Sequence, residues 1–311
     1  MDQVAPTRAR RLRHPADKEW LPREVRRNLW IYIVLIPPFA MFTIFTLIPI
    51  ARSLLLSFQT WTLKQTTWSG LTNFRQLVSD PVFFKALKNT FLYTLAVVPI
   101  STAIALSLSA FIFRLPSAAQ TFFKSAFYLP AVVAAVVVVL VWRWIYNPNE
   151  YGLLNYLLSL AGKEPVLWLQ KSRSALPALT ATSLVGGGGG AVVLLLSAMG
   201  GIPITLYECA RLDGSNRRQE FWYITLPLLK PSILYLTVMG TIGSFQVFTG
   251  ILLLTQGGPN YATTTTVFQI YKTAFQHFEF GYASAQAVVL FLIIMAFSFF
   301  LFRILASEVE F

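Results

Sequence analysis

Six long stretches without a charged residue limit what this chain can fold into. They lie at residues 28–51, 89–113, 125–142, 174–207, 231–271 and 280–302. A helix that crosses a bilayer needs about 20 mostly apolar residues, and lipid cannot satisfy the polar groups of an open backbone. The fourth and fifth stretches exceed one span, so each should include the end of a loop. The chain is therefore predicted to be an all-α, polytopic membrane protein with six transmembrane helices.

The composition supports a membrane protein. Hydrophobic residues make up 55% of the chain and charged residues 12%, with a mean hydropathy of +0.60. Soluble proteins carry about 25% charged residues. The net charge of +12 is best explained by basic loops beside anionic lipid rather than by nucleic-acid binding. The single cysteine, Cys209, leaves no internal disulfide framework and too few thiols for a cysteine-based zinc site.

The first apolar stretch is expected to remain as a membrane anchor. It is longer than the apolar core of a signal peptide, and no small-residue cleavage site follows it. Its Pro37-Pro38 pair should break or kink the helix, because proline cannot donate the helical hydrogen bond.

Lysine and arginine predict the orientation of the spans. They are concentrated before residue 28, which places the N-terminus in the cytoplasm. Residues 1–27 are then a basic cytoplasmic tail, 28–306 a six-helix transmembrane domain with a cytoplasmic loop at 200–230, and 307–311 a cytoplasmic C-terminal tail. The predicted outer loops are residues 59–88, 146–173 and roughly 255–279.

The sequence lacks the signatures of enzymes and of ion-coupled carriers. Five glycines at 186–190 are not followed by the Lys-Ser or Lys-Thr of a phosphate-binding loop. The two histidines, His14 and His277, fall on opposite sides of the membrane in this topology. No carboxylate lies inside a predicted span, which disfavours a proton-driven porter. We expect no catalytic residue, metal or cofactor in this chain, and an energy source on another chain.

One cytoplasmic segment, ECARLDGSNRRQEFWYITLPLLKP at residues 208–231, interrupts the apolar sequence. Residues 208–212 should form a short helix that ends at Asp213-Gly214, because glycine accepts the left-handed conformation that follows many helices. Ser215 or Asn216 should cap a second helix. The residues expected on the solvent-exposed face of this second helix are Arg217, Arg218, Gln219 and Glu220.

Leu226-Pro227 should end the second helix before the next span, and a helix pair of this kind can dock into a groove of another protein. The order Glu208-Cys209-Ala210, Gly214 and Leu226-Pro227 closely resembles the EAA loop of ABC-importer permeases, with Cys209 in place of the usual alanine. Further segments resemble the carbohydrate branch of these permeases, the MalF type: GLTNF at 70–74, WRWIY at 142–146 with GLLN at 152–155, LTQGGP at 254–259 and GYASA at 281–285. The resemblance covers roughly residues 29–305 and implies the type I ABC-importer permease fold.

The resemblance also implies partners. The chain would pair with a second, homologous permease subunit. Two ATPase subunits, which bind ATP and Mg, would dock on the EAA loops, and an extracytoplasmic binding protein would deliver the solute. The residues expected to couple to the ATPases are Glu208, Cys209, Ala210, Arg211, Asp213, Gly214, Arg217, Arg218, Leu226 and Pro227. Glu208 would accept hydrogen bonds or an ion pair there, and Gly214 would permit the turn.

The glycines at 186–190 have two interpretations. Small residues within a span favour close helix packing, but broken, glycine-rich helices near the middle of a membrane also suit a solute site. On the resemblance, the positions that face sugar in these permeases fall on Ser183, Gly187, Gly190, Gly240, Gly243 and Ser244, with Gln246 nearby. Glycine at so many of them implies a wide cavity, or one in which the partner permease makes most contacts.

The predicted function is a permease subunit of an ATP-driven importer for a saccharide or a related polyhydroxy solute. The alternative solutes are a polyol, a glycerol phosphate or an acidic oligosaccharide. An ion-coupled porter or channel would need ionisable residues in its spans. A structural membrane subunit would leave the glycine-lined positions unexplained.

Overall fold

The computed structural model describes residues 29–61, 66–133, 135–186 and 188–305. The predicted tails at 1–27 and 307–311, as well as Gly187, lie outside these residues. The chain falls into two units, Met1–Arg52 and Ser53–Phe311, and each is described by itself.

The first unit contains the start of a long apolar helix. Helix α2 (Leu29–Phe42), the π-helical turn η1 (Thr43–Leu47) and α3 (Ile48–Leu56) follow one another without a gap. Together they give a 27-residue candidate span, Trp30–Leu56, with a mean hydropathy of 2.2. Of the break or kink predicted at Pro37-Pro38, the break is wrong, because α2 runs through both prolines, and the kink stays a prediction. A broken helix would leave several backbone groups unsatisfied in lipid, whereas proline inside a spanning helix is tolerated.

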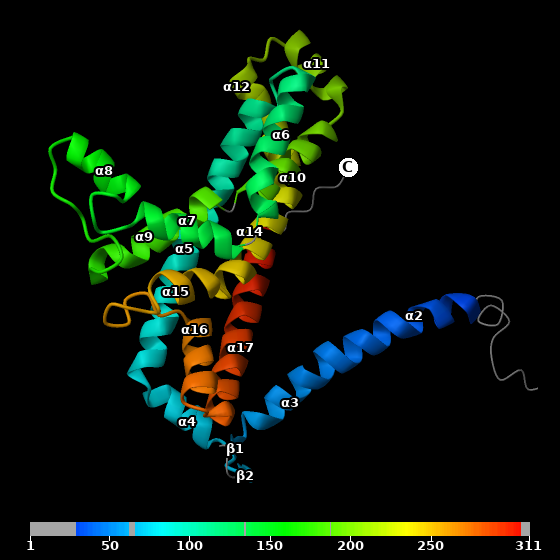
Figure 1. Cartoon of the computed structure of the whole chain (residues 1–311). Helices are drawn as coiled ribbons and strands as arrows, with labels where there is room; N and C mark the ends of the chain where they lie inside the picture. The colour runs from blue at the N-terminus through cyan, green and yellow to red at the C-terminus, as the bar shows by residue number, and fades with distance from the viewer. Residues whose placement is uncertain (1–28, 62–65, 134, 187, 306–311) are drawn as a thin grey trace, which may run out of the picture. The chain divides into compact units, whose positions relative to one another are not determined.

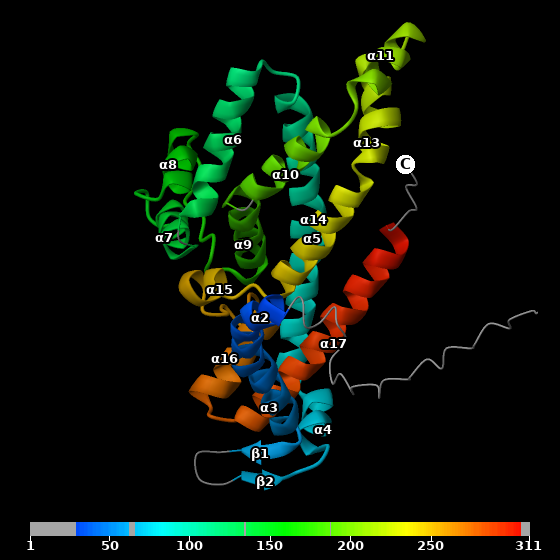
Figure 2. The same cartoon turned by 90° about the vertical axis from the view of Figure 1, so that its right-hand side faces the viewer.

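The second unit is a helical assembly with one short hairpin. Its elements are β1 (Gln59–Trp61), β2 (Thr66–Trp68), α4 (Thr72–Ser79), α5 (Pro81–Ile112), α6 (Ser117–Val132), α7 (Ala135–Ile145), α8 (Leu153–Leu160), α9 (Ser172–Gly186), α10 (Gly189–Gly200), α11 (Ile204–Leu212), α12 (Arg217–Gln219), η2 (Glu220–Thr225), α13 (Leu226–Leu228), α14 (Lys230–Phe245), α15 (Thr249–Leu254), α16 (Thr266–Tyr271), η3 (Lys272–Gln276) and α17 (Phe280–Leu305). Strands β1 and β2 pair antiparallel, with Gln59 opposite Trp68. In both views α11 lies at one end of this unit, and the hairpin with α4 lies at the other (Figures 1 and 2).

The spans differ from six straight helices. By length and composition, three helices among the described residues can cross a membrane: Trp30–Leu56, Pro81–Ile112 and Phe280–Leu305. Two pairs of helices, each joined at a bend, add up to two more candidate spans. They are α9 with α10, bent by 44°, and Arg217–Leu228 with α14, bent by 62°. The predicted third span, residues 125–142, is instead divided between α6 and α7, with a bend at Val133. Because α7 has only 11 residues, it is too short to cross a bilayer alone.

Asp80 fixes where the long helix α5 begins. Its Oδ1 accepts hydrogen bonds from the backbone N–H groups of Val82 at 2.8 Å and Phe83 at 3.2 Å, and Pro81 occupies the first helical turn. Both features are typical of a helix start. The other carboxylate oxygen, Oδ2, accepts a hydrogen bond from the Tyr282 hydroxyl of α17 at 2.7 Å. One side chain therefore caps α5 and ties it to the last helix.

The main apolar core lies where α5 and α10 meet. Its buried members are Ala105 and Ile112 of α5 and Val192, Leu195 and Leu196 of α10, with Phe123 and Phe127 of α6 and Ile233 and Leu236 of α14 packed against them. A smaller cluster joins α9, α15 and α16 through Leu179, Ile251 and Phe268. Residues from the apolar stretches of the sequence thus form the contacts that hold α5, α6, α10 and α14 together.

Three buried asparagines hold loops of this unit. The Asn73 amide donates to the backbone carbonyls of Ser57 and Gln59 at 2.9 and 3.0 Å. Asn89 binds two carbonyls of the loop before α16, and Asn155 binds backbone groups on both sides of α8. A buried carbonyl without a partner is costly. These amides let irregular loops pack against helices.

Adjacent glycines of α10 have opposite surroundings. A Cβ atom on Gly189 would lie 1.9 Å from the carbonyl oxygen of Phe127 on α6, so α10 and α6 approach each other closely there. A Cβ atom on Gly190 would meet nothing within 4 Å. Close packing is therefore the correct interpretation of Gly189, but it does not account for Gly190.

We predict that Gly189→Ala destabilises the protein and Gly190→Ala does not. The new methyl group at 189 must push α10 away from the α6 backbone, and overpacking of this kind costs about 1–3 kcal/mol. At 190 alanine favours the helix over glycine by about 1 kcal/mol. Thermal unfolding of the two purified variants in the same detergent measures the difference. Equal unfolding midpoints would contradict the close approach.

Candidate functional site

The cytoplasmic segment predicted from sequence is a compact pair of helices. Helix α11 ends at Leu212, and Gly214 adopts the left-handed conformation with φ +81°. The Gly214 N–H donates to the Arg211 carbonyl at 3.0 Å, and the Ser215 N–H donates to the Ala210 carbonyl at 2.9 Å. These two bonds form a Schellman motif, which satisfies the last carbonyls of a helix. The predicted turn at Asp213-Gly214 is confirmed.

Asn216 is the cap of the second helix. Its Oδ1 accepts hydrogen bonds from the N–H groups of Arg218 at 3.1 Å and Gln219 at 3.0 Å. The Gln219 side chain in turn accepts from the Asn216 N–H at 2.8 Å. This reciprocal pair is a capping box, so both ends of the turn are fixed by hydrogen bonds within the segment.

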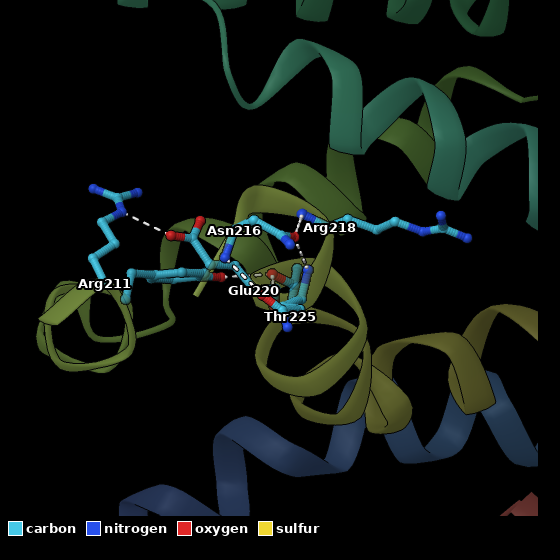
Figure 3. Close-up of polar contacts among 7 residues, drawn as sticks. Arg211, Asn216, Arg218, Glu220 and Thr225 are labelled. Carbon is cyan, nitrogen blue, oxygen red and sulfur yellow. Dashed lines mark hydrogen bonds and ion pairs between the residues drawn. The ribbon is translucent and has the colours of Figure 1, made fainter. Parts of the chain in front are cut away.

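An ion pair joins the two helices. Nε of Arg211 donates to Oε1 of Glu220 at 2.7 Å (Figure 3). The prediction that Glu220 faces water is wrong: it is buried, since it turns back toward α11. The hydrogen bond to Glu220 and the charge of that carboxylate raise the pKa of Arg211, and Glu208 raises it further. Arg211 therefore stays charged, and the buried carboxylate keeps its partner.

A second contact lies beside this ion pair. The Tyr207 hydroxyl of α11 lies 2.9 Å from Oγ1 of Thr225, and both residues are buried. Leu226-Pro227 does not end the second helix as predicted. The helix runs from Arg217 to Leu228 through the π-helical stretch η2 and bends only before α14. Pro227 lies close to the end of this continuous helix, just after the π-helical stretch.

The predicted coupling residues all lie on this helix pair. Those that are exposed are Glu208, Cys209, Arg211, Asp213, Gly214, Arg217 and Arg218, whereas Ala210, Leu226 and Pro227 are half-buried. Large apolar side chains are exposed among them, with Leu212 88%, Tyr223 79% and Trp222 54% accessible. A surface that combines exposed arginines with exposed aromatic rings has the composition of a protein interface.

Two of the predicted path residues, Ser183 and Ser244, contact one stretch of α5. The Ser183 hydroxyl of α9 is hydrogen-bonded to the Tyr93 hydroxyl. The Ser244 hydroxyl of α14 lies 3.0 Å from Oγ1 of Thr94. Ser244 is buried, so its hydroxyl lies behind the surface that a solute would contact. Neighbouring residues of α5 thus connect the two helices that carry the predicted path.

The described glycines of the predicted path leave open space. A Cβ atom on Gly243 would meet nothing within 4 Å, as at Gly190, and one on Gly240 would touch Val98 at an ordinary 3.7 Å. Gln246 is exposed at the C-terminal end of α14. Gly187 lies outside the described residues.

Comparison with known proteins identifies the family. The sequence profile described as "Binding-protein-dependent transport system inner membrane component" matches residues 103–310. This chain belongs to that family. It is an integral membrane protein, and the family is a transport component rather than an ATPase.

Relatives and a solved structure agree with this family. The chain is 35% identical to the probable ABC transporter permease protein YesP of Bacillus subtilis, over 93% of this chain and 94% of YesP. It is 30% identical to the arabinooligosaccharides transport system permease protein AraP of Halalkalibacterium halodurans, over 85% of this chain and 84% of AraP. It also superposes, with a TM-score of 0.83 and 24% identity, on a chain of a bacterial ABC transporter involved in alginate import. That match covers 93% of this chain and 99% of the other, which confirms the ABC-importer permease fold.

The sequence pattern did not predict the roles of three residues: Glu220 in the helix pair, and Tyr93 and Thr94 beside the predicted path. The sequence pattern predicts Glu220 on the exposed face of its helix. Its pairing with Arg211 depends on the turn that brings the two helices together. Tyr93 and Thr94 are polar side chains inside an apolar stretch, which is a signal that could have found them. Polar residues in spans often face the interior of the assembly.

We predict that Arg211→Gln loosens the helix pair more than the double variant Arg211→Gln/Glu220→Gln. The single change leaves a buried carboxylate without its partner, whereas the double change replaces it by a neutral amide. Hydrogen exchange of amides 207–225 in the purified protein is the measurement. Arg218→Gln is the matched control, because its side chain points away from Glu220 (Figure 3) and its effect should add to that of Glu220→Gln. Additive effects of the Arg211 and Glu220 changes would contradict the ion pair.

Proposed function

We propose that this chain is a transmembrane permease subunit of an ATP-driven ABC importer and forms half of the translocation path for a saccharide. The observation that carries the proposal is the exposed, self-capped helix pair at 204–228. Its matched residues Glu208, Gly214 and Leu226-Pro227 resemble the EAA loop in sequence. Family membership supports the dependence on a binding protein.

The partners proposed with it are a second, homologous permease subunit and two ATPase subunits. ATP and Mg would be bound by the ATPases, which dock on the EAA loop of each permease. The extracytoplasmic binding protein would bring the solute to the opposite face. Both termini and the helix pair would then be cytoplasmic, and the hairpin with α4 would face outward.

Coupling would follow from the rigidity of the helix pair. The Schellman turn, the capping box and the Arg211–Glu220 ion pair make α11 and the following helix one body. When ATP draws the ATPases together, that body would move with them. The motion would reach α14 directly, because α14 continues the same chain after a 62° bend. ATP can bias the two states only through its different affinity for each.

The proposed solute is an oligosaccharide or a related polyhydroxy compound. The relative AraP is described as an arabinooligosaccharide permease. The open surfaces at Gly190 and Gly243 favour a bulky solute, because neither glycine presents a side chain to the space beside it. Ser183, which is half-buried, would offer its hydroxyl group to such a solute, and the buried Tyr93 would hold that hydroxyl in place.

We predict that the chain co-purifies from its native membranes with an ATPase and a second polytopic permease in fixed proportion. Mild-detergent purification followed by mass spectrometry tests this. Vesicles that contain the complex should take up saccharide only when ATP and the binding protein are present. A chain that purifies without an ATPase, together with solute flux in ATP-free vesicles, would overturn the importer proposal in favour of a channel or porter.

We predict that Gly243→Trp blocks uptake without releasing the ATPase. The indole would fill the open space beside α14, whereas the methyl group of Gly243→Ala meets no neighbour. The measurement is ATP-dependent saccharide uptake, with the amount of co-purified ATPase recorded for each variant. Normal uptake by the tryptophan variant would remove Gly243 from the path.

A further inference from the structure

A cavity at the opposite end of α5 from the helix pair gathers positive charge. It has a volume of about 630 Å³ and lies between α5, α9 and the loop before α16. Pockets that take small molecules range over roughly 300–1,000 Å³. Its residues come from all three loops or loop ends that the topology assigns to the outer side. The segments are distant in sequence, but the fold brings them to one place.

Three cations line this cavity: Lys85 and Lys88 of α5 and Arg173 of α9. No carboxylate among the described residues lines it, and none of the three cations forms an ion pair with another described residue. Like charges gathered in a cleft repel one another and attract anions from solution. The charge of this cavity therefore selects for an anionic ligand.

The loop that forms one wall of the cavity is held in a strained conformation. Asn260 and Tyr261 both have positive φ, 48° and 59°. Lys85 donates to the Asn260 carbonyl, and Asn89 donates to the Tyr261 carbonyl at 2.8 Å. Left-handed conformations of non-glycine residues are uncommon and cluster at functional sites. Both hydrogen bonds that hold this loop conformation are donated by residues of α5, which also supplies two of the three cations.

The ring of Tyr261 lies beside Lys85, one of the three cations; Tyr261 does not itself line the cavity, but its neighbours Asn260 and Ala262 do. Nζ of Lys85 lies 5.9 Å from the centre of the Tyr261 ring, and Nζ of Lys272 lies 5.7 Å from it. Tyr261 is 44% exposed. Rings with an apolar body and a polar tip serve as contact surfaces for ligands that are partly apolar and partly polar. The faces of sugar rings have this character.

The cavity is in line with the proposed solute path. Asn89 lines the cavity and Tyr93 follows one turn later on α5, about 6 Å along the axis. Leu176 lines it on α9, and Ser183 follows two turns later, about 10 Å along that axis. Tyr93 and Ser183 are hydrogen-bonded to each other. The same faces of the two helices thus lead from the cavity to the predicted path.

We propose that this cavity is an outer selection site for an acidic saccharide, with Lys88 and Arg173 binding a carboxylate of the sugar. The inference rests on the proposed import function and narrows its solute to anionic sugars. Lys85 positions the wall of the site through its bond to Asn260.

The test compares two ligands of one skeleton. Trigalacturonate carries carboxylates, and its fully methyl-esterified form carries none. Binding of each to the purified complex in nanodiscs is measured at low salt by isothermal titration calorimetry. The acid should bind about tenfold or more tightly than the ester, which corresponds to about 1.4 kcal/mol. Added salt should weaken binding of the acid, because exposed charges are screened.

Variants assign the effect to the cavity. Lys88→Gln/Arg173→Gln should bring the affinity for the acid to that for the ester. Lys171→Gln is the matched control, because Lys171 is exposed near Arg173 but does not line the cavity. It should leave the preference for the acid unchanged.

Each other outcome overturns the inference. Equal binding of acid and ester, no binding of either, or an unchanged preference in the double variant removes the acidic-saccharide site. A double variant that instead loses affinity only for the purified binding protein would assign the cations to protein docking. ATP-dependent uptake of a neutral oligosaccharide by the same complex separates the two proposals: if it persists, the importer function stands without this site.

Discussion

The packing of α6, α10 and α14 against α5 is the constraint on which the rest of the second unit depends. The core of α5 and α10 holds one half of this helix, and Asn89 in its other half holds the loop before α16. Asp80 sets its first turn and links it to α17. Because the same helix bears Tyr93 and Thr94, the two helices of the predicted path are positioned by one rigid element. A change in the register of α5 would therefore move the core, the path and the outer cavity together.

The helical membrane fold and the turn of the cytoplasmic segment could be predicted from sequence, because both depend on local chemistry. Long uncharged runs predict spans, and Asp213-Gly214 followed by Asn216 predicts a stop and a cap. Features that depend on distant contacts could not be predicted. The burial of Glu220 follows from the folding back of its helix onto α11. Two further features do not follow from the conformational preferences of single residues. They are the division of the third span between α6 and α7 and the continuity of α2 through Pro37-Pro38.

The cytoplasmic helix pair is stabilised by its own contacts. Its turn, its cap and its ion pair are all internal, and the Tyr207–Thr225 contact lies behind them. The surface that remains is formed by exposed arginines and by the rings of Trp222 and Tyr223. A partner that docks there would meet a surface that is already ordered, so little conformational entropy would be lost on assembly. This suits a segment that must transmit motion rather than absorb it.

The break between α9 and α10 separates two parts of one span. On the α10 side, Gly189 lies against the backbone of α6 and tolerates no added atom. On the α9 side, the helix contributes to the outer cavity and carries Ser183. In the proposed importer, substitutions in α9 would therefore change the range of solutes, whereas Gly189 must be kept to hold α10 against α6. Members of the family that share this break would be expected to diverge faster in α9 than in α10.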